Sequence, residues 1–150
     1  ESLRMNRELA FFIPALGVVV ADQLTKLWVR SFIPMGNSVP ILGPVRFTHV
    51  ANSGAVFGLP AHPLVLIGLI VIIMAVLVLS YRQSYFDGWL LRPVLGTLLG
   101  GGVGNLIDRL RLGYVTDFVD LQIWPVFNLA DSIIVVGTAT LIYSLISRRK

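Results

Sequence analysis

The side chains in this sequence that could do acid–base chemistry are mostly aspartates close to the ends of apolar segments. The eight acidic residues are Glu1, Glu8, Asp22, Asp87, Asp108, Asp117, Asp120 and Asp131. An ionised carboxylate at membrane depth costs several kcal/mol, so such a residue needs a partner or a wet cavity and is a candidate for function. The topology argued below places five of them at one level: Asp22, Asp108, Asp117, Asp120 and Asp131. This convergence predicts a cleft at that level.

Asp117 and Asp131 are the best candidates for a catalytic pair. Both have apolar neighbours, in the stretches TDFVD and NLADS, and neither has an adjacent cation. Two carboxyl groups within hydrogen-bonding reach do not easily both ionise, so one keeps a proton while the other can activate water. This pair predicts the chemistry of an aspartic peptidase, which requires neither a metal nor a nucleophilic side chain.

The other aspartates have simpler interpretations. Asp22 and Lys26 are four residues apart on one helical face, so they can neutralise each other in a structural or substrate-orienting role. Asp108 is followed by Arg109, which favours a structural ion pair. Asp120 is interpreted as a solvated loop acid.

Other reaction and binding classes find little support. The chain has no cysteine, its two histidines lack the HExxH spacing and are interpreted as polar surface, and no G-x-S-x-G elbow is present, so we expect no metal and no cofactor. The formal charge of +4 comes from Lys and Arg placed singly or at segment ends, which argues against nucleic acid. The alternative that stays open is a non-catalytic membrane binding protein or small transporter that uses the acidic cluster.

The segments that must position these residues are apolar and long. Of 150 residues, 55% are hydrophobic and only 13% are charged, which indicates one polytopic membrane domain spanning 1–150. We predict four transmembrane helices, at about 9–29, 63–80, 90–110 and 128–146. The third carries five small residues that permit close helix contacts, so it should lie centrally. These residues are Gly96, Gly100, Gly101, Gly102 and Gly104.

Basic residues set the predicted orientation. Seven of them fall together on the side of both termini, which the positive-inside rule makes cytoplasmic. They are Arg4, Arg7, Arg82, Arg92, Arg148, Arg149 and Lys150. The segments 32–62 and 113–127 then lie outside, where VRFTHV at 45–50 predicts a short strand or hairpin. The predicted fold is therefore an all-α polytopic membrane protein with a small β-containing extracytoplasmic cap.

Five motifs in order along the chain resemble those of lipoprotein signal peptidase, the bacterial type II signal peptidase. They are DQLTK at 22–26, NSGAVFG at 52–58, GNLIDR at 104–109, GYVTDF at 113–118 and FNLAD at 127–131. The resemblance implies a four-span aspartic endopeptidase of the bacterial inner membrane. Its substrates would be diacylglyceryl-modified prolipoproteins, which it would cleave before the lipidated cysteine, in contact with membrane lipids. A monomer is compatible with the sequence.

The resemblance also assigns roles to residues. It places the catalytic pair at Asp117 and Asp131, and it implies that further residues line or brace the substrate site. These are Asp22, Lys26, Asn52, Gly101, Asn105, Asp108, Arg109 and Asn128, with Asp108 ranked third as a possible acid. The two amides Asn105 and Asn128 could orient the carboxylates or only satisfy helix-end backbone groups. Arg109 could grip a lipid phosphate or a substrate carbonyl, or only extend toward the membrane surface.

Overall fold

Four long helices make up most of the computed structural model, which describes residues 2–40, 42–56, 59–60, 62–81 and 90–147. The helices are α1 (Ser2–Phe32), α2 (Pro63–Tyr81), α3 (Leu91–Leu112) and α4 (Leu129–Ser147). Each predicted span coincides with one helix, although α1 begins seven residues earlier than predicted. The apolar run predicts only the part of α1 that hydrocarbon would cover, whereas the helix itself continues into the polar sequence before it.

Two of the described helices are long and apolar enough to cross a membrane, within Asn6–Phe32 of α1 and at Leu129–Ser147 of α4. The apolar part of α2, Leu64–Ser80, is slightly shorter. In α3 the glycines and the polar residues near its end dilute the hydrophobic character. The structure thus shows a mostly helical chain, and length and composition identify two of the four predicted spans.

Helix α3 lies at the centre of the bundle and packs against α1, α2 and α4. Phe11 and Ala15 of α1 form a buried apolar cluster with Leu95 and Leu99 of α3. The predicted central position of the glycine-rich helix is confirmed. A Cβ atom added at Gly100 would lie 2.5 Å from the Ala15 carbonyl oxygen, so only glycine permits this close approach.

Replacing Gly100 with alanine should therefore destabilise the bundle. The new methyl group meets the backbone of α1, which cannot move like a flexible side chain, and such overpacking costs about 1–3 kcal/mol. The matched control is Gly17→Ala on the exposed side of α1, where an added Cβ has nothing within 4 Å. Thermal unfolding in detergent should show a lower midpoint for Gly100→Ala than for the native chain, whereas the midpoint of Gly17→Ala should not fall. Equal midpoints for the two variants would contradict this account of the α1–α3 contact.

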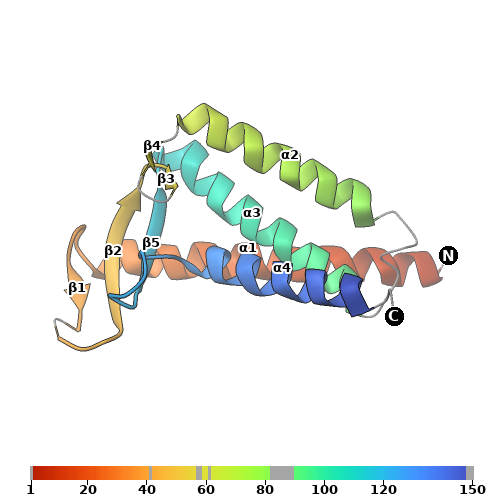
Figure 1. Ribbon diagram of the computed structural model, residues 1–150, viewed down its shortest axis with the longest axis horizontal. Coiled ribbons are helices and arrows are strands. Elements are labelled where there is room, and N and C mark those ends of the chain that lie inside the picture. The colour runs from red at the N-terminus through yellow and green to blue at the C-terminus, as the bar shows by residue number, and fades with distance from the viewer. Residues whose placement is uncertain (1, 41, 57–58, 61, 82–89, 148–150) are drawn as a thin grey trace.

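A small sheet covers one end of the bundle. Strands β1 (Ser38–Val39), β2 (Arg46–Asn52) and β5 (Val115–Asp120) pair antiparallel in the order β1-β2-β5. Two further short strands, β3 (Ala55–Val56) and β4 (Leu59–Pro60), pair with each other. The strand predicted at 45–50 is β2, and strands from the segments 32–62 and 113–127 form a joint cap. Figure 1 shows both termini at the end of the bundle opposite to this sheet, as an even number of spans predicts.

The sheet is fixed to α1 by a second buried cluster, in which Phe118 of β5 packs against Val29 and Ile33. The register of β2 and β5 places Val50 opposite Asp117. Alternate residues of a strand point to opposite faces, so Phe118 anchors β5 to α1 while its neighbour Asp117 faces the other way. The fold thereby presents Asp117 toward the start of α4.

Candidate active site

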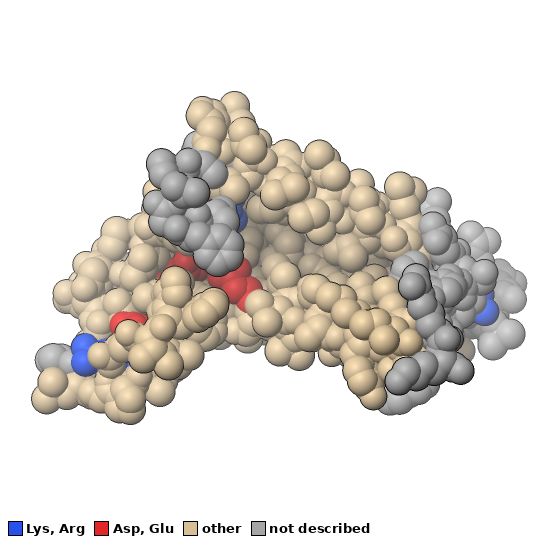
Figure 2. All heavy atoms as spheres, in the orientation of Figure 1, with Lys and Arg blue, Asp and Glu red and all other residues tan. Residues whose placement is uncertain are grey.

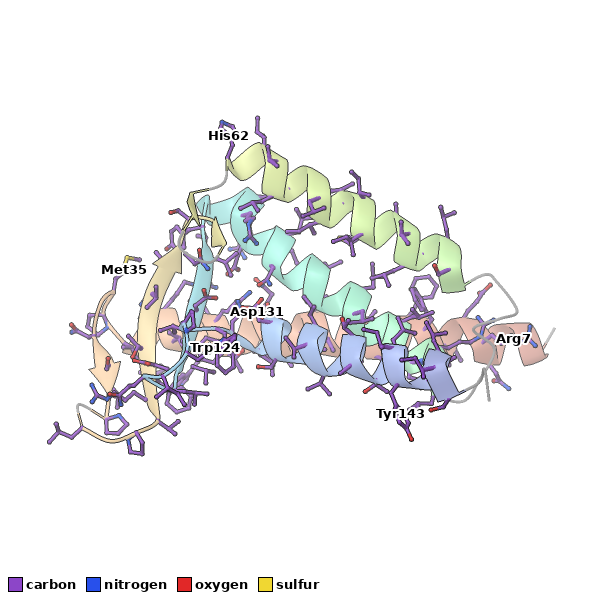
Figure 3. The ribbon with its side chains drawn as sticks, in the orientation of Figure 1. Arg7, Met35, His62, Trp124, Asp131 and Tyr143 are labelled. Carbon is purple, nitrogen blue, oxygen red and sulfur yellow. The ribbon has the colours of Figure 1, made fainter. Side chains whose placement is uncertain are left out.

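Asp117 and Asp131 approach the same place from different elements. Asp117 lies in the middle of β5 and is 2% exposed, whereas Asp131 lies in the first turn of α4 and is partly accessible. Figure 3 shows Asp131 at the end of α4 that adjoins the sheet. In Figure 2 acidic side chains reach the surface in a recess between the cap and the helices.

Asn128 immediately precedes α4 and fixes Asp131 by a reciprocal cap. The Asp131 backbone N–H donates to Asn128 Oδ1 at 2.9 Å, and the Asn128 backbone N–H donates to Asp131 Oδ2 at 3.3 Å. This arrangement has the geometry of a capping box, with aspartate in place of the usual glutamate or glutamine. The same turn that starts the helix therefore sets the position of the Asp131 carboxyl group.

Two amide side chains connect the carboxyl groups. Asn128 Nδ2 donates to Asp117 Oδ1 at 2.7 Å and to Asn105 Oδ1 at 3.1 Å. Asn105 Nδ2 in turn donates to Asp131 Oδ1 at 2.8 Å. Asn128 thus fills both roles that the sequence left open, because it caps a helix and orients a carboxylate. Asn105 lies within α3, so its side chain orients a carboxylate and does not cap a helix end.

Asp117 has a third amide partner, since Asn52 Nδ2 donates to its Oδ2 atom at 2.9 Å. The Asn52 amide is held in turn, because its Oδ1 atom accepts the Gly54 backbone N–H at 3.0 Å. Burial raises the pKa of Asp117 to about 6; the hydrogen bond from Asn52 opposes this rise and the negative charge of Asp131 adds to it. Asp117 can therefore gain or lose its proton close to neutral pH.

A buried ion pair lies next to the amides. Lys26 Nζ is 2.8 Å from Asp22 Oδ2 and donates to Asn105 Oδ1 at 2.9 Å, and both charged side chains are fully buried. The other Asp22 oxygen accepts the Ala130 backbone N–H at 3.1 Å, in the first turn of α4. The predicted pairing of Asp22 with Lys26 is confirmed. The pair also braces Asn105 and the start of α4.

Asp108 lies with Asp22 and Lys26 in one group of buried charges, which we call the charged cluster. The predicted pairing of Asp108 with Arg109 was wrong. Its Oδ2 atom is 3.4 Å from Lys26 Nζ and its Oδ1 atom is 3.7 Å from Arg30 Nη1, whereas it forms no ion pair with Arg109. Consecutive helical residues do not face each other, which explains the error. Asp108 Oδ2 also accepts the Thr116 backbone N–H at 3.0 Å. It therefore contacts the backbone beside Asp117 and not the carboxyl pair.

Arg109 is partly buried, and its Nη1–H donates to the Asn105 carbonyl oxygen at 3.5 Å. Its positive charge lies close enough to interact with Asp131, Asp117 and Asp108. Gly101 contacts α4 and not the carboxyl groups: a Cβ atom there would be 2.8 Å from Ile134 Cγ1 and 3.1 Å from the Ala130 carbonyl oxygen. Gly101 thus permits the close packing of α3 on α4, near the turn that carries Asp131.

Two sequence interpretations need correction. Asp120 is the last residue of β5 and not a loop acid, and hydrogen bonds from the Thr48 hydroxyl and the Gln122 backbone N–H lower its pKa. His49 is 4% exposed and not polar surface, because its Nδ1–H donates to the Ile33 carbonyl oxygen at 2.7 Å. The start of β2 lies against the end of α1, so a polar residue in this strand can be buried.

Sequence reasoning missed three residues of the charged cluster. Gln23 Nε2 donates to Asp108 Oδ1 at 3.2 Å and to the Gly104 carbonyl oxygen at 3.1 Å. Arg30 Nη1 donates at 3.0 Å to the hydroxyl of Thr116, which is fully buried. Gln23 and Thr116 lie inside the motifs DQLTK and GYVTDF, and Arg30 follows Lys26 by one helical turn, so the other polar residues of the motifs and of the same helical face were the available signal.

Comparisons with known proteins agree with this geometry. The sequence pattern of the family described as Signal peptidase (SPase) II matches residues 14–147. The chain belongs to this family. The predicted family resemblance is thereby confirmed, and the alternative of a non-catalytic binding protein or small transporter is not favoured. Among the described residues, no three or more His, Cys, Asp or Glu side chains are grouped as metal ligands would be.

Individual relatives cover nearly the whole chain. The lipoprotein signal peptidase of Moorella thermoacetica is 46% identical over 138 residues, which is 91% of this chain and 92% of that protein. The lipoprotein signal peptidase of Halothermothrix orenii is 41% identical over 141 residues, covering 93% and 97% of the two chains. Members of this family process prolipoproteins, so the chain is a peptidase of that kind.

Two similar solved structures are described as bacterial membrane enzymes determined by the in meso method. The one at 2.3 Å resolution has a TM-score of 0.82 and 29% identity, covering 92% of this chain and 88% of the other. The one at 1.9 Å resolution has a TM-score of 0.78 and 29% identity, covering 89% and 90%. The signal peptidase II fold of this chain is thus that of a membrane enzyme.

Proposed function

We propose that this member of the family is an aspartic endopeptidase with Asp117 and Asp131 as its catalytic pair. The observation that carries the proposal is the linkage of the two carboxyl groups through Asn105 and Asn128 at an accessible recess. The substrate would be a prolipoprotein whose cysteine already carries diacylglyceryl, and cleavage would occur before that cysteine. The names of the relatives support the prolipoprotein class.

The mechanism requires one proton on the pair. The ionised carboxylate, as general base, takes a proton from water, whose oxygen attacks the scissile carbonyl carbon. The protonated partner polarises the carbonyl oxygen and then protonates the leaving amine. Because Asn52, Asn105 and Asn128 hold the carboxyl groups, little rotational freedom is lost when the transition state forms. The nearby charge of Arg109 would stabilise the negative charge that develops, or bind the lipid phosphate.

The proposed setting is the bacterial cytoplasmic membrane, crossed by all four helices. Both termini would be cytoplasmic and the recess would face the extracytoplasmic side. The arrangement in Figure 1 supports this, because the helices run side by side and the cap lies opposite to the termini. A lipidated substrate diffuses in the bilayer while its scissile bond needs water, and a site at the interface meets both demands.

One assay tests the activity directly. The purified chain in phospholipid vesicles is incubated with a diacylglyceryl-modified prolipoprotein, and release of the signal peptide is followed by gel mobility and mass. The matched control is the same prolipoprotein without the lipid. We expect cleavage of the lipidated form, with the new amino terminus at the modified cysteine. Binding without cleavage would contradict the proposal.

The activity should depend on pH through the carboxyl pair. Burial and the charge of Asp131 raise the pKa of Asp117 to about 6. As the pH rises through this value, the two carboxyl groups therefore lose the last proton that they share. Below this pH the pair holds the one proton that acid–base catalysis requires, and above it both carboxyls ionise. We expect kcat/KM to fall as pH rises through this value, by up to about tenfold per unit. A rise over the same range would instead identify Asp117 as the base.

Metal removal should leave turnover unchanged. The proposed mechanism uses two carboxyl groups and water, so no step depends on a Lewis acid. Steady-state cleavage is measured before and after dialysis against excess EDTA, with an EDTA-sensitive metallopeptidase treated in parallel as a control. A loss of turnover that added zinc or magnesium restores would argue against the carboxyl pair as the sole catalytic group.

A further inference from the structure

The cap exposes a group of large apolar side chains. Its most exposed members are Ile123 at 92%, Leu42 at 81% and Trp124 at 63%, and Val45 and Phe47 are also exposed. We refer to these five residues as the apolar rim. A single exposed apolar residue is ordinary on a protein surface, but several neighbouring ones usually mark a surface that contacts another apolar phase.

The rim is one surface although its residues come from two segments. The Gly43 carbonyl oxygen accepts hydrogen bonds from Arg46 Nε, at 3.1 Å, and from Gln122 Nε2. The loop that carries Leu42 is thereby joined to the turn that carries Ile123. Asp120, at the end of β5, supports the same turn, since its Oδ1 atom accepts the Gln122 backbone N–H at 2.9 Å.

Aromatic contacts continue the rim onto α1. The ring of Phe47 meets that of Trp28 edge to face, with centroids 5.8 Å apart, and Trp28 lies 6.0 Å from Phe32 on the same helix. Trp28 and Phe32 are 47% and 71% exposed. These two residues belong to a helix long and apolar enough to cross a membrane, and they lie at its cap end. The apolar rim is therefore adjacent to a helix end that meets lipid.

The geometry points to a membrane surface as the partner of the rim: we propose that it rests in the headgroup zone of the extracytoplasmic phospholipid leaflet. Tryptophan and other aromatic residues are enriched there because their rings combine apolar and polar edges. Figure 1 shows β1, β2 and their connection extending sideways past α1 and α4, as a segment resting on the bilayer beside the helices would. In Figure 3 Trp124 lies near the start of α4, whereas Met35 lies on the far side of the cap.

The contact would set the height of the active site. Strand β5 ends at Asp120, two residues before Gln122, and the catalytic candidate Asp117 lies in the same strand. An interfacial segment buries its apolar face roughly 5–10 Å into the boundary between headgroups and acyl chains. Anchoring the rim at that depth fixes β5, and with it Asp117, relative to the bilayer surface.

The test introduces one cysteine at a time. Because the native chain has no cysteine, a thiol-reactive label attaches only at the introduced position. Leu42→Cys and Ile123→Cys report on the rim, and Met35→Cys is the matched control because Met35 is apolar, 55% exposed and directed away from the helices. Each full-length variant carries a nitroxide label in phosphatidylcholine nanodiscs that hold one copy. Power-saturation measurements compare collisions with oxygen, which enriches in lipid, and with a water-soluble nickel chelate.

We expect both rim labels to collide preferentially with oxygen, at a depth of roughly 5–10 Å, and the Met35 label to collide preferentially with the nickel chelate. The two rim positions are independent, so one variant that folds is sufficient. Nickel accessibility at the rim equal to that at Met35 would overturn the proposal. Such a result would show that the rim faces water in a lipid bilayer, as a surface normally covered by another protein would. Because the readout is not cleavage, it holds or fails independently of the proposed enzymatic activity.

Discussion

Asp117→Asn and Asp131→Asn should each reduce signal-peptide release by about 10²–10⁴-fold, the range that general acid–base catalysis typically contributes. Each substitution removes a proton donor or acceptor while keeping the shape of the side chain. An asparagine at 131 can still accept the Asn128 backbone N–H, so the start of α4 should remain intact. The loss should therefore appear in kcat with the protein folded.

The control for this pair is Asp120→Asn, which makes the same chemical change in the same strand. Asp120 accepts hydrogen bonds from Thr48 and Gln122 and none from the amides of the site. Its variant should cleave at nearly the native rate. Single-turnover cleavage of a diacylglyceryl-modified prolipoprotein gives the rates, and thermal unfolding in detergent verifies folding. Native activity in either Asp117→Asn or Asp131→Asn would rule out the assignment.

The helices were predictable from the sequence because long apolar runs have few alternatives in a chain of this length. The central position of α3 was also predictable, since small residues such as Gly96 and Gly100 have a use only against another backbone. The pairing of β2 with β5 was less accessible. β5 alternates weakly because both of its faces are covered: Phe118 packs on α1, and Asp117 faces the amides.

The site was predictable in part. Apolar neighbours and the family resemblance singled out Asp117 and Asp131, and the structure links these two carboxyl groups through Asn105 and Asn128. The partner of Asp108 could not be obtained from sequence proximity, because its ion pair is formed with Lys26, distant in the chain but 3.4 Å away, and not with the adjacent Arg109. The capping role of Asn128 depends on where α4 begins, and helix starts are the least certain part of a sequence prediction.

Lys26→Met should be the most destabilising single substitution in the charged cluster. It keeps the length and apolar stem of the side chain but leaves Asp22 and Asp108 buried with one fewer cation. Both carboxylates are at most 1% exposed, so water cannot replace the missing charge. Removing one member of a buried ion pair typically costs about 3–5 kcal/mol. Thermal unfolding in detergent should therefore show a strongly lowered midpoint.

The matched control removes charge in balance. In the double variant Asp22→Asn/Lys26→Met, Asp108 keeps Arg30 as its cation, and the asparagine at 22 can still accept the Ala130 backbone N–H. Neutralising both members of a buried pair costs much less than removing one, so the double variant should regain most of the lost stability. Any remaining loss of activity would then measure how far Lys26 orients Asn105, and through it Asp131. A double variant as unstable as Lys26→Met would show instead that packing of the lysine stem, and not its charge, stabilises the cluster.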